Sequence, residues 1–67
     1  MVAKGQYVID RAQRTGYRTI YTVREISGDR ALVQRSGEVI NGRVQWGIGW
    51  QRDESYRDLV NLELYRE

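Results

Sequence analysis

Apolar residues recur at every second position in the clearest stretch of this chain, which is the pattern of a β-strand with one buried face. Val44, Trp46, Ile48 and Trp50 alternate with polar residues and glycines. A helix would bring every third or fourth residue to one side, so this period predicts a strand. We expect its apolar side, Trp46 included, to face the core.

Shorter strand-like stretches flank this one on both sides. They are rich in Val, Ile, Tyr and Thr, which suit a pleated, half-buried surface. A bulge near Arg24 and Glu25 is needed to return Ile26 to the inner side of its strand. The polar stretch from Asp10 to Gly16 indicates a long loop. The remaining expected strands are Gln6–Ile9, Tyr17–Ile26, Ala31–Arg35 and Val60–Leu64.

Two short sequences predict tight turns between strands. Asn41-Gly42 lies between apolar residues, and both positions tolerate the positive φ that a two-residue hairpin requires. Ser27-Gly28-Asp29-Arg30 is a second turn sequence, before the strand that begins at Ala31. Ser36-Gly37 either kinks or turns the chain. The sequence therefore predicts an antiparallel arrangement of neighbouring strands.

One helical turn is expected before the last strand. Asp53 can cap a turn through Glu54–Asp58, with its acidic residues at the favourable N-terminal end. Tyr56, Leu59 and Val60 have helical spacing and are expected to pack inward together.

This order of elements resembles the Src homology 3-like small barrel, which includes KOW, Tudor and photosystem accessory-subunit types. The resemblance lies in the layout and in the segment Val23-x-x-Ile26-x-Gly28-Asp29-x-Ala31-x-Val33, which is similar to the central hairpin of such barrels. It implies an all-β fold, a barrel of five to six strands with one short helical turn before the last. The basic first loop and the absence of Pro argue against binding of proline-rich peptides. An oligonucleotide-binding five-stranded barrel is the main alternative fold.

Composition narrows the function classes. The 67 residues are expected to form a single small β-barrel domain. The chain has no Cys and no His, which removes thiolate and imidazole ligands and the usual nucleophile–base pairs. We therefore expect no catalytic, cofactor-binding or metal-binding site. No apolar run approaches the roughly 18 residues of a membrane span. We expect a cytoplasmic protein without membrane contact.

Charge is distributed unevenly along the chain. Residues 1–35 hold seven basic and three acidic residues, whereas residues 36–67 hold four basic and six acidic residues. Arg, which makes up most of the basic residues, suits planar contacts with phosphate, carboxylate and aromatic groups. The alternative explanation is a bias in genome composition, which produces the same excess of Arg without any functional meaning. Acidic residues 53, 54 and 58 are better explained by helix capping than by acid–base chemistry.

The candidate contact residues are Arg11, Arg14, Tyr17, Arg18, Arg43, Trp50 and Arg52.

These observations favour a non-catalytic protein-interaction module, an accessory or regulatory subunit that docks on a larger protein through Arg- and Tyr-rich loops. A virus-encoded inhibitor is one form that so small a chain could take. The alternative is a small nucleic-acid-binding domain that uses the basic N-terminal half. Homodimerisation is a further expectation, because a small chain without disulfides gains stability by burying more surface.

Overall fold

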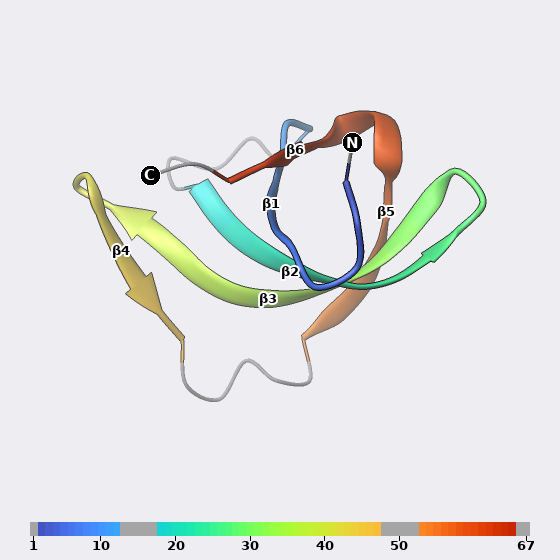
Figure 1. The fold of residues 1–67 in the computed structure, drawn as a ribbon. Helices are drawn as coiled ribbons and strands as arrows, with labels where there is room; N and C mark the ends of the chain where they lie inside the picture. Colours follow the sequence, from blue (N-terminus) through green and yellow to red (C-terminus); the bar gives the residue numbers. More distant parts are fainter. Residues whose placement is uncertain (1, 13–17, 48–52, 66–67) are drawn as a thin grey trace.

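The computed structural model describes residues 2–12, 18–47 and 53–65, and the structural statements below concern these residues. They form six antiparallel β-strands and one turn of 3-10 helix (Figure 1). The all-β prediction is thus confirmed. The elements are β1 (Tyr7–Asp10), β2 (Arg18–Ser27), β3 (Arg30–Ile40), β4 (Arg43–Trp46), β5 (Glu54–Asp58), η1 (Leu59–Asn61) and β6 (Leu62–Leu64).

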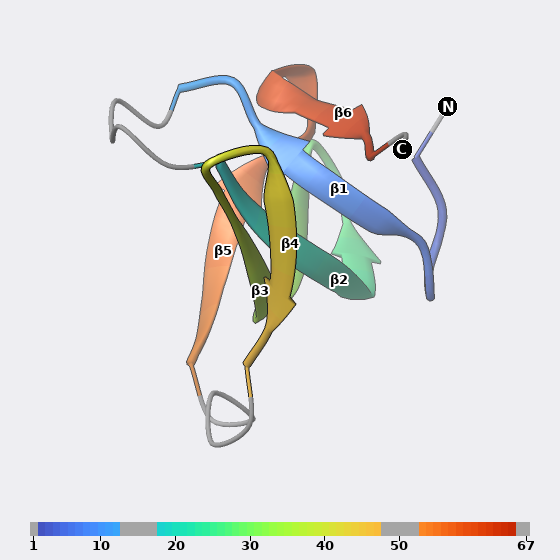
Figure 2. The same cartoon turned by 90° about the vertical axis from the view of Figure 1, so that its left-hand side faces the viewer.

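Strand β3 organises the sheet because it is long enough to pair with three strands. Residues 30–39 of this strand pair with β2, and beyond β2 the order continues through β1 to β6. Its other edge is shared, since β4 pairs with Gly37–Ile40 and β5 pairs with Arg30–Gln34. Figure 1 shows β4 and β5 at opposite ends of β3, and Figure 2 shows the same sheet from the side of β4.

The sheet is strongly curved, and β2 and β3 form its trough in Figure 1. Two register shifts between these strands, at Ile20/Tyr21 and Val23/Glu25, are β-bulges of the kind that bend and twist a strand. The bulge expected near Arg24 and Glu25 is confirmed. It does not bring Ile26 inside, however, because this side chain is exposed near the end of the β2–β3 hairpin.

Both expected turns are confirmed. Asn41 and Gly42 have φ values of 52° and 77°, as a two-residue hairpin between β3 and β4 requires. Gly28 lies at φ 61° in the turn between β2 and β3. Gly37 does not turn the chain but stays within β3.

The core lies on the concave side of the sheet, which we call the inner face. Its buried side chains come from four strands, β1, β2, β3 and β6, so they hold distant parts of the chain together. Leu59 of η1, Val2 and Leu64 pack against this cluster. The cluster comprises Val8, Tyr21, Val23, Ala31, Val33 and Leu62.

The sheet does not close into a barrel, because no ladder joins β6 to β4 or β5 among the described strands. The expected barrel closure is therefore not found. Contacts outside the ladders instead join the end of β1 to η1, the segment that links β5 with β6. The amide of Arg11, which follows β1, donates to the carbonyl of Asn61 in η1 at 2.8 Å, and its guanidinium donates to the Val60 carbonyl at 2.5 Å.

Two expectations about the second half of the chain are wrong. Glu54–Asp58 is strand β5 and not a helical turn, because the free edge of β3 pairs with it; the 3-10 turn begins only at Leu59. Asp53 caps no helix, and its carbonyl accepts a hydrogen bond from the Arg35 amide at 2.9 Å. Tyr56 and Val60 are exposed and do not pack inward. Leu59 alone of that set reaches the core.

Candidate functional site

The convex side of the sheet, which we call the outer face, has a buried centre of its own. Residues directly opposite each other in a ladder share a face. Ile20 pairs with Ile9 on one side and with Gly37 on the other, and Gly37 pairs with Trp46. Ile20 is fully buried, yet it is not part of the inner cluster. The outer face therefore holds Ile20 beneath groups from the neighbouring strands.

An aromatic pair lies on this face. The rings of Tyr7 in β1 and Trp46 in β4 have centroids 5.0 Å apart and are tilted by 43°. Their strands are separated by β2 and β3, so the two side chains reach toward each other across the sheet. Tyr7 remains 47% exposed and Trp46 49% exposed. The expectation that Trp46 belongs to the core is therefore wrong: its apolar alternation with Val44 is real, but it faces the outer side.

Gly37 makes the position of the Trp46 ring possible. A Cβ atom at this position would lie 2.9 Å from Cε3 of Trp46 and 3.1 Å from the carbonyl oxygen of Gln45. Both distances are below ordinary van der Waals contact, so any side chain here would displace the ring. The glycine is needed for close approach, which is a common reason for Gly within a strand.

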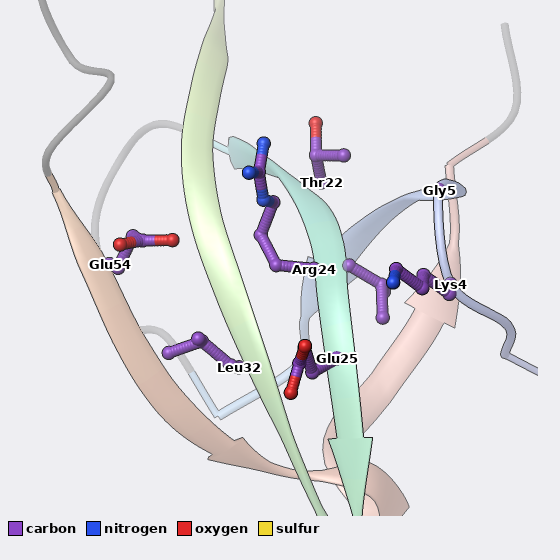
Figure 3. A pocket seen from close by; sticks show the side chains of 8 residues that line it. Lys4, Gly5, Thr22, Arg24, Glu25, Leu32 and Glu54 are labelled. Carbon is purple, nitrogen blue, oxygen red and sulfur yellow. The ribbon is translucent and has the colours of Figure 1, made fainter.

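A shallow cleft of about 320 Å³ lies beside the aromatic pair on the same face (Figure 3). Thr22, which lines it, is the ladder partner of Tyr7, so the cleft and the aromatic pair adjoin. In the close-up, Arg24 lies between Glu54 and Lys4. The Arg24 guanidinium donates to Oε1 of Gln34 at 3.1 Å. The cleft is lined by Lys4, Gly5, Thr22, Val23, Arg24, Glu25, Leu32 and Glu54.

A polar network lies on the inner face, opposite this surface. The Arg57 guanidinium of β5 donates to Oδ2 of Asp10 in β1 at 3.1 Å and to the Tyr21 hydroxyl in β2 at 3.2 Å. It also lies 5.1 Å from the centroid of the Tyr21 ring. Asp10 is buried, and its Oδ1 accepts a hydrogen bond from the Ala12 amide at 2.9 Å. Arg57 thus connects β5 with β1 and β2, two strands with which β5 forms no ladder.

Burial raises the pKa of Tyr21, and the adjacent Arg57 cation offsets part of this effect. A second charged cluster lies near the same tyrosine. Arg35, the ladder partner of Tyr21, pairs with Glu38 and lies 3.6 Å from Asp53. Each of these charges has an opposite charge beside it. This is the usual arrangement of a structural network, which needs no ligand to complete it.

The sequence-predicted contact residues have mixed outcomes. Arg11 is engaged with η1, as described above, and Arg43 is exposed directly after the Asn41-Gly42 turn. Arg18 is the first residue of β2. The predicted residues Arg14, Tyr17, Trp50 and Arg52 lie outside the described residues. The structure adds Tyr7 and Trp46, which sequence reasoning did not select because alternation alone does not tell which side of a strand faces the core.

Within the described ranges, no group of three or more Asp and Glu side chains is placed to hold a metal ion. No helix of this part of the chain is long and apolar enough to cross a membrane. The chain matches no family model, no curated protein and no solved structure.

Proposed function

We propose that this chain is a non-catalytic protein-interaction module, an accessory or regulatory subunit that docks on a larger protein through its outer face. The observation that carries the proposal is the exposed Tyr7–Trp46 pair, set over a buried Ile20. Trp and Tyr are the side chains most enriched at the energetic centres of protein interfaces. Each ring still has about half of its surface to bury, which gives a partner an apolar anchor.

The charges of the outer face favour a protein over a phosphate backbone. The cleft beside the aromatic pair carries Lys4 and Arg24 together with Glu25 and Glu54. Nucleic-acid sites have a marked excess of cations, because their affinity comes largely from the phosphates. A balanced surface of this kind suits a polypeptide with side chains of both signs.

A Src homology 3-like layout is part of the proposal. It is supported by the single 3-10 turn directly before the last strand and by the pairing of that strand with β1. The ladders join the strands in the order β6, β1, β2, β3, β5, which also supports this layout. A cytoplasmic location also remains part of the proposal.

Site-specific photo-crosslinking tests this function. A photoreactive phenylalanine analogue replaces Trp46 in one variant and Val60 in a control, since Val60 is 74% exposed and lies in η1, outside the strands that form the outer face. After irradiation in extract of the native host, we expect position 46 to form a discrete adduct with a protein other than this chain, and unlabelled wild type should suppress this adduct. Identical adducts from both positions, or none from position 46, would contradict the proposal.

A second candidate, nucleic-acid binding, is supported by a different observation. Arg11 follows the end of β1, Arg18 begins β2 and Arg43 begins β4, and the ladder register puts these three positions at one end of the sheet. Titration with labelled single-stranded and duplex oligonucleotides at two salt concentrations tests it. Binding that weakens steeply with salt, and that Arg11→Ala, Arg14→Ala and Arg18→Ala together abolish, would favour this candidate. No binding even at low salt would reject it.

A further inference from the structure

We infer that the free edge of β4 pairs with β4 of a second copy of this chain, so that two sheets join into one. This inference does not depend on the proposed docking of the outer face. It starts from the ladder: among the described residues, β3 is the one strand that pairs with β4. An unpaired strand edge presents a row of main-chain donors and acceptors to another chain.

The hairpin determines which groups point outward. In a two-residue hairpin the residues that flank the turn, here Ile40 and Arg43, exchange hydrogen bonds with each other. At the far end of β4, the Gly47 amide donates to the Ser36 carbonyl at 3.0 Å. Residues 43, 45 and 47 therefore direct their main-chain groups toward β3. Val44 and Trp46 direct theirs to the free edge.

A two-fold axis through Gln45 lets the outward main-chain groups of Val44 and Trp46 form hydrogen bonds with those of the second copy. Val44 then lies opposite the partner copy's Trp46, and the two symmetric pairs form about four main-chain hydrogen bonds. Val44 and Trp46 both lie on the outer face, so each apolar side chain meets an apolar one in a favourable cross-strand pair. Arg43 lies opposite the partner copy's Gly47, which avoids a like-charge contact.

The other described edges are less suited to pairing with themselves. Symmetric pairing of β5 about Tyr56 would put Glu54 opposite the partner copy's Asp58, two like charges. Strand β6 has three residues, which limits the ladder that it can form. In β4, by contrast, the single charge is Arg43 and the register with β3 shows no bulge. Bulges and clusters of charge are the usual devices that protect an edge.

Sedimentation of the full chain over a wide range of concentrations tests the inference. We expect the average mass to rise from monomer to dimer, and a monomer at every concentration would overturn it. Gln45→Lys and Gln45→Glu each put two like charges at the axis. We expect each to raise the dissociation constant by at least about tenfold. Mixing the two variants should restore a heterodimer.

Two further variants identify the surface. Val44→Pro removes an outward amide that β3 does not use, so it should abolish the dimer while circular dichroism shows the fold unchanged. Tyr56→Lys, on the exposed face of β5, is the matched control and should leave dimerisation as it is in the wild type. A dimer that persists in Gln45→Lys and in Val44→Pro would show that another surface forms it and would overturn the inference.

Discussion

The two faces of the sheet hold their aromatic side chains in different ways. On the inner face, Tyr21 is buried and receives a hydrogen bond from Arg57, which is itself paired with Asp10. On the outer face, Tyr7 and Trp46 contact each other and stay half exposed. The inner ring belongs to a network that holds the fold, whereas the outer rings retain exposed surface, which we propose that a partner covers.

The largest effect is expected at the inner network. Arg57→Met keeps the length of the side chain but leaves the buried Asp10 carboxylate without its cation. Breaking a buried ion pair on one side costs about 3 kcal/mol or somewhat more. Arg57 is partly exposed, so we expect a loss of about 2–3 kcal/mol in the free energy of unfolding, measured with urea. Arg30→Met is the control, since Arg30 and Asp58 form an exposed pair; a similar loss there would contradict the special role of Arg57.

A smaller effect is expected on the outer face from Gly37→Ala. The added methyl group would clash with the Trp46 ring, which is exposed and can move aside. It would also press on the carbonyl oxygen of Gln45, which the β-ladder holds in place. We expect a loss of about 1–2 kcal/mol together with separation of the Tyr7 and Trp46 rings. The near-ultraviolet circular dichroism of the aromatic groups should change accordingly. An unchanged spectrum would mean that Trp46 does not rest on Gly37.

The smallest effect concerns Tyr21 at alkaline pH. Because burial raises its pKa above the ordinary value of 10.0, the folded state keeps a proton that the unfolded state releases. This contribution to stability is fully present below pH 10.0 and is lost as the pH rises above it. Tyr21→Phe lacks the contribution and also loses the hydrogen bond from Arg57, worth about 1 kcal/mol. The melting temperatures of the two proteins should therefore converge above that pH. A difference that widens there would contradict the assignment.

The local parts of the fold could be predicted from the sequence. The Asn41-Gly42 hairpin, the turn at Gly28 and the bulge near Glu25 all depend on residues close in the chain, and the structure confirms them. The strand at residues 54–58 could not be predicted from neighbouring residues in this way. Its acidic start suggests a capped turn, but the free edge of β3 makes it a strand, and that edge exists only once β4 ends at Trp46. Strand formation depends on tertiary context more than helix capping does.

The candidate site shows the same limit. Alternation put Val44 and Trp46 on one side of their strand, and the register agrees. Which side faces the core is decided by the curvature of β2 and β3, and a sequence period carries no information about this. Asp10 is a comparable case: it reads as the start of a polar loop, yet it ends β1 and is buried through a partner 47 positions away.

The free energy of unfolding of Trp46→Ala tests the central claim most directly. If Trp46 serves binding, the loss should stay below about 1.5 kcal/mol, the order of one exposed aromatic pair. Unlabelled Trp46→Ala should then no longer suppress the adduct that wild type suppresses in the crosslinking experiment. A loss of about 3 kcal/mol or more, as expected for a large core side chain, would show that Trp46 holds the fold and would contradict the claim.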